Sequence, residues 1–404
     1  MRILFYNHTG QIGGAERLLI TLLARLDREQ FAPLLICPAA GPLHGLAVKE
    51  GVPAETIEGL QARFTWRIDH LLRYLISFMQ VIRQLRKKVS DSQPDLIHAN
   101  SVRAGLVATM ATVGLKQTVI WHVHDLLPRH PFNIFIRAVA ALSSRTQIIA
   151  VARASADRLT GKFAGLRRRA AVIPNGVDLE KLSATAGGRE RIRHELKIEA
   201  DAPVIGMIGR LTPAKGQLEV LQLFPAILTR FPNARLLLAG APAFNNENEY
   251  LQLLEQTIAE MNLADRVQLL GARDDVADIL QALDLLVVNS ASEACSLVIL
   301  EAMAGGTTVL ATSTGGTPEI IEHLRNGWLV AFGNGEELAE GVISLLSDRD
   351  GRRRLGAQAQ RDSISRYSIP RFMNEMHGYY RAINGVRIPE QKNLPSFEVS
   401  LTSD

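Results

Sequence analysis

The sequence predicts an α/β protein built from two Rossmann-like domains. Short apolar runs alternate with amphipathic helical patterns along most of the chain, which is typical of a parallel sheet covered by helices on both faces. The alternation stops at a polar stretch, 179–201, and restarts with the same order of strand, glycine loop and helix. With 404 residues, 47% of them hydrophobic, the chain can fill two cores of ordinary size.

The first half opens with an apolar run at 2–6, a glycine-containing loop, and leucines at helical spacing over 15–26. In this layout backbone amides can approach a phosphate, here near Gly13 and Gly14. The loop does not match Gly-x-Gly-x-x-Gly, so NAD binding is not expected. The same reasoning predicts further strands at 32–37, 96–98, 118–121, 147–151 and 171–173.

Polar side chains follow two of these strands. Asn100 comes just after 96–98, and His124 with Asp125 just after 118–121. Ligands of parallel sheets bind beyond the carboxyl ends of the strands. His124 could therefore orient a substrate hydroxyl or accept its proton. A histidine that makes only structural hydrogen bonds is the alternative.

The second half repeats the layout. A strand at 203–208 leads into a loop that carries Arg210 and Lys215, whose side chains suit a diphosphate; each alone could also be a surface cation. We predict a first domain at 1–185, a second at 190–366, and a polar disordered tail at 385–404. The patterns give strands at 236–239, 267–270, 285–288 and 308–310, and helices near 249–261, 275–281, 336–346, 352–363 and 370–382.

The stretch 284–301 combines a buried strand, a loop of small residues and a helix. Glu293 and Glu301 bracket the turn and would lie about 12 Å apart if both were helical, which is too far to share a proton. They could instead hold opposite ends of one elongated ligand. The amides at the start of the helix suit a diphosphate. An ordinary turn with two solvated glutamates is the alternative.

Cysteine content and the lengths of the apolar runs indicate the cellular compartment. The two cysteines, Cys37 and Cys295, are far apart and lack metal-ligand spacing, which favours a reducing compartment. The N-terminal run is short for a signal peptide, and no apolar run reaches the length of a membrane span. These features predict a cytoplasmic protein. Asp348-Arg349-Asp350 resembles a metal-binding Asp-x-Asp, but its surroundings are typical of a solvated turn.

Positive charge is concentrated in the segment 61–90, where seven arginines and lysines face one acid, Asp69. Apolar residues recur there at helical spacing. A basic amphipathic helix can lie on anionic lipid, so the segment predicts peripheral contact with the inner face of a membrane. The alternative is a surface helix whose apolar stripe faces the core. Nucleic acid is not an expected partner, because no binding motif accompanies the basic residues.

Seven short motifs, each weak alone, occur in a specific order: Gly13-Gly14-Ala15-Glu16-Arg17, Pro94-Asp95-Leu96-Ile97-His98, His124-Asp125, Pro174-Asn175-Gly176-Val177-Asp178, Gly209-Arg210-Leu211 with Lys215-Gly216, Glu293 with Glu301, and Gly315-Gly316-Thr317-Pro318-Glu319. With them the sequence resembles the family 4 (group 1) retaining nucleotide-sugar glycosyltransferases, which have the GT-B fold.

The resemblance implies an acceptor-binding first domain and a donor-binding second domain that face each other across a cleft, with 370–382 packing back on the first. It implies transfer of a hexose-type sugar from a UDP- or GDP-sugar to a glycan or lipid-linked acceptor in cell-envelope polysaccharide synthesis. Anomeric configuration would be retained, and no metal or other cofactor would be needed. The alternatives are a nucleotide-sugar 2-epimerase and a donor-binding, non-catalytic subunit of a glycan synthesis complex.

The resemblance also assigns roles. Arg210 and Lys215 would hold the donor diphosphate, and Glu301 the ribose hydroxyls. The donor sugar would meet Glu293 and His124. Further donor contacts would come from Gly13, Gly14, Ala294, Cys295, Ser296 and Leu297, and the candidates on the acceptor side are Glu16, Asn100 and Asp125. The family usually has Gly-Phe-Gly or a similar sequence after the glutamate, where this chain has Ala294-Cys295-Ser296.

Overall fold

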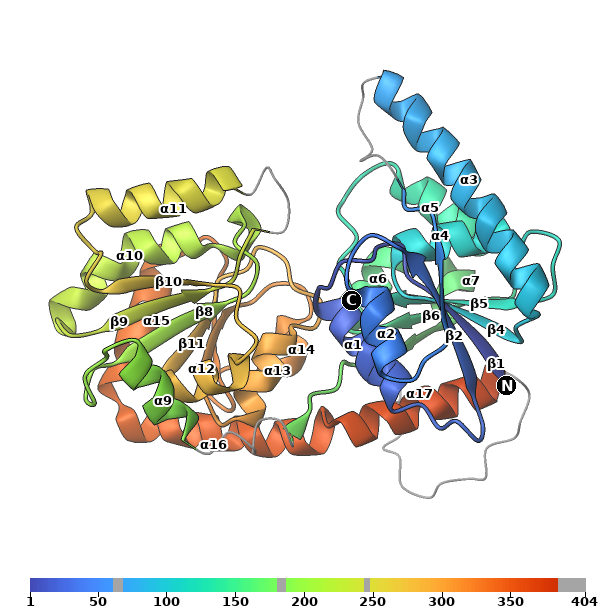
Figure 1. The fold of residues 1–404 in the computed structure, drawn as a ribbon. Coiled ribbons are helices and arrows are strands. Elements are labelled where there is room, and N and C mark those ends of the chain that lie inside the picture. Colours follow the sequence, from blue (N-terminus) through green and yellow to red (C-terminus); the bar gives the residue numbers. More distant parts are fainter. Residues whose placement is uncertain (61–67, 180–186, 243–247, 384–404) are drawn as a thin grey trace.

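A computed structural model describes residues 1–60, 68–179, 187–242 and 248–383 (Figure 1). It contains two α/β bodies, each with an open sheet between layers of helices. This arrangement confirms the predicted fold class of two Rossmann-like domains. The predicted boundary at 185–190 overlaps 180–186, which lies outside the described residues, as do the whole predicted tail at 385–404 and the first part of the basic segment.

The described N-terminal residues form a seven-stranded parallel sheet in the order β3-β2-β1-β4-β5-β6-β7. Its central strands consist mostly of apolar residues because helices cover both faces. The edge strand β3 is partly exposed and was not predicted. The strands are β1 Arg2–Tyr6, β2 Ala32–Pro38, β3 Ala54–Ile57, β4 Leu96–Ala99, β5 Thr118–Val123, β6 Thr146–Ala150 and β7 Ala170–Val172.

Two core layers flank this sheet. One packs it against α3, α4 and α5, and the other against α1, α2 and the final helix, α17. The helices of this part are α1 Gly14–Ala24, α2 Leu43–Lys49, α3 Ile68–Ser92, α4 Val102–Ala111, α5 Asn133–Ala141, α6 Arg153–Thr160 and α7 Ala164–Arg167.

The described C-terminal residues form a six-stranded parallel sheet in the order β10-β9-β8-β11-β12-β13. Its strands are β8 Val204–Ile208, β9 Arg235–Ala239, β10 Val267–Gly271, β11 Leu285–Val288, β12 Val309–Thr312 and β13 Trp328–Val330. Its helices are α9 Gly188–Glu195, η1 Pro213–Lys215, α10 Gln217–Arg230, α11 Asn248–Glu260, α12 Val276–Ala282, α13 Leu297–Ala304, α14 Thr317–Ile320, α15 Gly335–Ser347 and α16 Arg349–Arg366.

The final helix, α17 Ile369–Ile383, runs from the second domain back across the first (Figure 1). Phe372, Met376 and Tyr380 are fully buried on its inner face. They pack in one core with Phe5 and Phe31 from the start of the chain. The first domain is therefore completed by residues that follow the whole second domain.

The described part of the basic segment, from residue 68 on, belongs to α3, which extends past the sheet in Figure 1. Val81, Leu85 and Val89 on its second half are buried in the core. On its first half, the side chains at 75, 76 and 79 are large, apolar and exposed. The helix thus has a core stripe and, before it, an uncovered apolar patch. Among the described residues, no helix is both long enough and apolar enough to cross a bilayer.

Candidate active site

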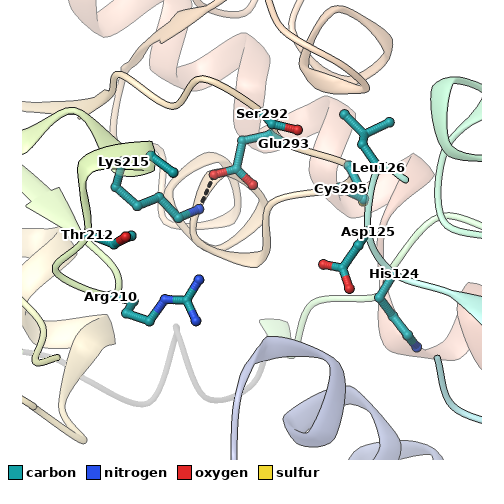
Figure 2. Close-up of a pocket in the computed structure, with 11 residues that line it drawn as sticks. His124, Asp125, Leu126, Arg210, Thr212, Lys215, Ser292, Glu293 and Cys295 are labelled. Carbon is teal, nitrogen blue, oxygen red and sulfur yellow. Dashed lines mark hydrogen bonds and ion pairs between the residues drawn. The ribbon is translucent and has the colours of Figure 1, made fainter. Parts of the chain in front are cut away.

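The candidate active site lies between loops at the carboxyl ends of the two sheets. Residues that follow β5, β8 and β11 line one cavity there. Figure 2 shows Arg210 and Lys215 on one side of it and His124 with Asp125 on the other. The cavity is lined by His124, Asp125, Leu126, Arg210, Thr212, Ala214, Lys215, Ser292, Glu293, Ala294 and Cys295. The structure therefore brings all four predicted catalytic residues together, from both domains.

The short helix η1 places Lys215 next to the loop that follows β11. It ends at Gly216, whose φ of +67° is strained for other residues, and a Cβ there would lie 2.3 Å from the carbonyl oxygen of Asn289. Lys215 Nζ forms an ion pair with Glu293 Oε1, which also accepts a hydrogen bond of 2.8 Å from Ser290 Oγ. An anionic ligand that recruits Lys215 must therefore compete with Glu293.

Asp125 is the acid on the opposite wall. Its carboxylate is exposed to the cleft, but the surrounding protein displaces enough water to raise its pKa, and the charges of Arg210 and Lys215 oppose this rise. The negative charge of Glu293 raises the pKa further. Cations and carboxylates are thus interleaved across the cavity, as binding a polar substrate with a charged leaving group requires.

His124 is held from behind by a buried chain of amides. Its Nε2 lies 2.9 Å from Asn100 Oδ1, and Asn100 Nδ2 donates to Asn7 Oδ1 over 3.0 Å. Asn7 Nδ2 in turn donates to Glu16 Oε1 over 3.2 Å. Asn7, Asn100 and Glu16 are all buried. Asn100 and Glu16, predicted to face the acceptor, therefore lie behind the wall of the cleft and support it.

Burial shifts the pKa values of the two titratable groups at the ends of this hydrogen-bonded series, His124 and Glu16. Loss of solvent lowers the pKa of His124 to about 3 and raises the pKa of Glu16. Hydrogen bonds to the Glu16 carboxylate oppose this rise in its pKa, among them one of 2.9 Å from the backbone amide of Gly13 and one from Asn7. Glu16 thus connects the glycine loop to the support of His124.

The glycine loop faces the second domain across the cleft. A Cβ on Gly14 would lie 3.5 Å from Leu297 Cδ1, so the start of α1 lies opposite the start of α13. Gly13 and Gly14 are therefore close to the helix whose amides were predicted to meet phosphate. Glu301 lies in α13, one turn beyond its start, and is not among the cavity-lining residues.

The loop Ala294-Cys295-Ser296 is buried and held by its neighbours. Asn175 Nδ2 donates to the Cys295 carbonyl over 2.8 Å, and the amide of Gly316 donates to the Glu293 carbonyl over 2.9 Å. A Cβ on Gly316 would lie 1.9 Å from the Ala294 carbonyl oxygen. Glycine is required in the neighbouring segment because the two backbones are in contact.

Two groups of supporting hydrogen bonds were missed by the sequence analysis. Tyr380 OH lies 2.9 Å from His98 Nδ1, and His98 Nε2 lies 3.1 Å from Nδ1 of His122, all in the core. The Glu319 carboxylate accepts hydrogen bonds from the first amides of α6, Arg153 N at 2.7 Å and Ala154 N at 2.8 Å. Each contact joins residues more than twenty positions apart, and no local pattern indicates such pairs.

Comparison with known proteins connects this geometry to a family. Residues 12–181 match the family model described as Glycosyltransferase Family 4, and residues 188–362 match Glycosyl transferases group 1. A D-inositol 3-phosphate glycosyltransferase from Corynebacterium urealyticum is 32% identical over 54% of this chain and 52% of its own length. The chain spans about half the length of this relative and of other curated relatives that it matches.

Other relatives match over more of their length. The UDP-Gal:alpha-D-GlcNAc-diphosphoundecaprenol alpha-1,3-galactosyltransferase of Escherichia coli is 24% identical over 84% of this chain and 86% of its own. The crystal structure of Anabaena HepE in complex with UDP has a TM-score of 0.80 and 27% identity, covering 95% of this chain and 100% of HepE. A HepE complex with UDP-glucose has a TM-score of 0.79, with the same identity and coverage.

The two family models fall on the two domains in order, and a solved relative superposes on nearly the whole chain. The chain therefore belongs to the group 1, family 4 glycosyltransferases and has the GT-B fold.

Proposed function

We propose that the protein transfers a hexose-type sugar from a UDP- or GDP-sugar to a glycan or lipid-linked acceptor of a cell-envelope polysaccharide. The observation that carries the proposal is the shared cavity of Arg210, Lys215 and Glu293 from one domain with His124 and Asp125 from the other. The proposal is supported by the bound UDP and UDP-glucose of HepE and by the lipid-linked substrate named for the E. coli relative.

Charge development explains how these residues would act. The leaving nucleoside diphosphate gains negative charge as its bond to the sugar breaks. Arg210, Lys215 and the amides at the start of α13 are fixed positive groups that stabilise this charge in the transition state. In this scheme they supply the neutralisation without a metal ion or other cofactor.

The ion pair between Lys215 and Glu293 gives the donor a role in preparing the site. A diphosphate near Lys215 draws the ammonium away from the carboxylate. Glu293, still held by Ser290, then accepts hydrogen bonds from hydroxyls of the donor sugar. The carboxylate becomes available only when a charged donor is present.

The remaining assignments complete the proposed reaction. Glu301 binds the ribose hydroxyls, and the loop from Ala294 to Leu297 meets sugar and phosphate. The acceptor hydroxyl approaches beside Asp125, on the same face of the sugar as the leaving group. Its oxygen bonds to the anomeric carbon as the bond to the diphosphate breaks, its proton passes to an oxygen of the departing diphosphate, and the product retains the anomeric configuration.

A panel of UDP- and GDP-sugars tests the proposal. We expect one donor to raise the melting temperature and to be slowly hydrolysed, and NMR of the product to show the donor's anomeric configuration. Turnover to a C2 epimer without acceptor would instead establish the epimerase alternative. Donor binding with no transfer to any acceptor would favour the non-catalytic subunit, and failure to bind every donor would contradict the proposal.

We further infer that α3 contacts an anionic membrane from the cytoplasmic side. The exposed apolar side chains Leu75, Ile76 and Met79 precede Arg83 and Lys87, which are also exposed. Apolar insertion and attraction to lipid phosphates would act along the same helix. The contact would bring a lipid-linked acceptor to the first domain.

Reversing the charge of Arg83 and Lys87 is expected to weaken binding to vesicles rich in phosphatidylglycerol by about 30-fold or more, because each basic residue near the surface contributes about 1 kcal/mol. Co-sedimentation at low and high salt measures the effect. The control is R349E/R353E, two exposed arginines at the same spacing on α16. Absence of wild-type binding at low salt, or an equal loss in both variants, would reject membrane contact.

A further inference from the structure

The hydrogen bonds behind His124 have a fixed donor-to-acceptor direction, which is set at Asn7. Asn7 Nδ2 lies 2.7 Å from the Thr9 carbonyl oxygen and 3.2 Å from Glu16 Oε1. A main-chain carbonyl can only accept a hydrogen bond. The Asn7 atom between these partners must therefore be its NH₂ group, and the other end of its amide is an acceptor.

This orientation passes to Asn100. The Asn100 NH₂ group lies 3.0 Å from Asn7 Oδ1 and 3.4 Å from the Ala15 carbonyl oxygen, both of which accept. The remaining atom of Asn100, Oδ1, faces His124 Nε2 at 2.9 Å. Because this oxygen can only accept, Nε2 must carry a hydrogen. A neutral imidazole has one N–H, so Nδ1 of His124 carries a lone pair.

The opposite tautomer of His124, with its hydrogen on Nδ1, would disrupt the whole series of hydrogen bonds. A lone pair on Nε2 would face the oxygen of Asn100, and turning Asn100 over would bring its oxygen against Asn7 Oδ1 and the Ala15 carbonyl. Turning Asn7 as well would bring its oxygen against Thr9 and Glu16. Asn7 and Asn100 are 0% and 1% exposed, so water cannot separate these paired acceptors.

The imidazole ring of His124 also packs against a second group of buried side chains. The ring centroids of His122 and His124 lie 4.0 Å apart, and His122 is bonded to His98, which is bonded to Tyr380. Within the described part of the chain, no hydrogen bond engages His124 Nδ1, and His124 lines the cavity.

We propose that Asn7 and Asn100 hold His124 as its Nε2–H tautomer, so that Nδ1 meets substrates only as a hydrogen-bond acceptor and selects a hydroxyl group. The two asparagines are positioning residues. The tautomer decides which groups can bind at Nδ1; that the bound group belongs to a sugar rests on the proposed function. A hydroxyl can donate to Nδ1, whereas a carboxylate, an ether oxygen or fluorine at the same position cannot. His124 thus orients a hydroxyl by accepting its hydrogen bond.

The tautomer can be measured in the full-length protein without substrate. We would record ¹⁵N NMR spectra with labelled histidine and assign His124 by its loss in His124→Gln. The expected result is a pyridine-type Nδ1 and a pyrrole-type Nε2. A pyrrole-type Nδ1 would overturn the proposal whether or not any sugar is transferred, so failure of the proposed function is distinguished from failure of this inference.

Two variants make the test specific. Asn100→Ala removes the acceptor, and we expect the His124 signals to shift towards a mixture of tautomers. Ser101→Ala is the control, because Ser101 Oγ bonds His8 Nδ1 at 2.9 Å instead; it should move His8 and leave His124 unchanged. His124 signals that stay fixed in a folded Asn100→Ala would refute the positioning role, and the wild-type measurement remains decisive if that variant does not fold.

Donor analogues test the selectivity. At one sugar position we expect the deoxy and deoxyfluoro analogues to bind about tenfold or more weakly and equally so, because neither can donate a hydrogen bond to Nδ1. In Asn100→Ala this discrimination should diminish. If the deoxyfluoro analogues bound as tightly as the natural donor at every sugar position, Nδ1 of His124 would not be acting only as an acceptor, and the proposal would be contradicted.

Discussion

Replacing Lys215 with alanine is expected to lower kcat for donor turnover by about 10²- to 10³-fold, the usual effect of removing one fixed donor from a developing charge. Lys215 lines the cavity and pairs with Glu293. Its loss removes positive charge from the leaving diphosphate and leaves the Glu293 carboxylate to repel it. Initial rates at saturating acceptor, measured as UDP or GDP release, check the result.

Two further variants isolate the cause. Lys116→Ala removes an exposed lysine on the first domain and should leave the rates unchanged. Lys215→Arg keeps the charge but changes its geometry, so we expect partial activity. Lys215→Arg should melt close to the wild type, whereas Lys215→Ala should melt somewhat lower, because it leaves the Glu293 carboxylate, whose side chain is only 11% exposed, without its cation. Unchanged kinetics in Lys215→Ala would refute the diphosphate assignment.

Replacing Phe372 with alanine is expected to destabilise the first domain by about 3–5 kcal/mol, the range for truncating a buried phenylalanine. Phe372 is 0% exposed and packs in the core that joins α17 to α1 and the sheet. Hydrogen exchange should show the loss of protection in β1, α1 and α17, with a smaller change in the second domain.

Phe332→Ala provides the comparison, because Phe332 is 55% exposed on the second domain. Its truncation should change stability by less than about 0.5 kcal/mol. Equal loss of protection in both variants, or no loss in Phe372→Ala, would show that α17 does not stabilise the first domain.

Much of the fold could be predicted because buried parallel strands are continuous apolar runs. The run at 285–288 is β11 without any shift. The strand β3 was missed because Glu55 and Thr56 are exposed at the sheet edge and break the pattern. The strand predicted at 118–121 continues to Val123, because His122 is buried and finds its hydrogen-bond partner in His98 on the adjacent strand.

The sequence allowed the residues of the site to be predicted, but not the contacts between them. Sequence order alone placed Arg210, Lys215 and Glu293 at the carboxyl ends of strands, where the structure has them. It did not indicate that Lys215 would pair with Glu293, 78 positions away. It also could not show that Asn100 is buried, since a polar residue after a strand can face either the solvent or the sheet.

The crossing of α17 has a consequence for biosynthesis. A ribosome releases the strands of the first domain long before it reaches Ile369, and the second domain has all its strands by Val330. The nascent first domain therefore retains an open apolar face beside Phe5 and Phe31 while its neighbour folds. We therefore expect a chaperone that binds apolar surface to occupy that face during translation, and the first domain to complete its core only after α17 has been made.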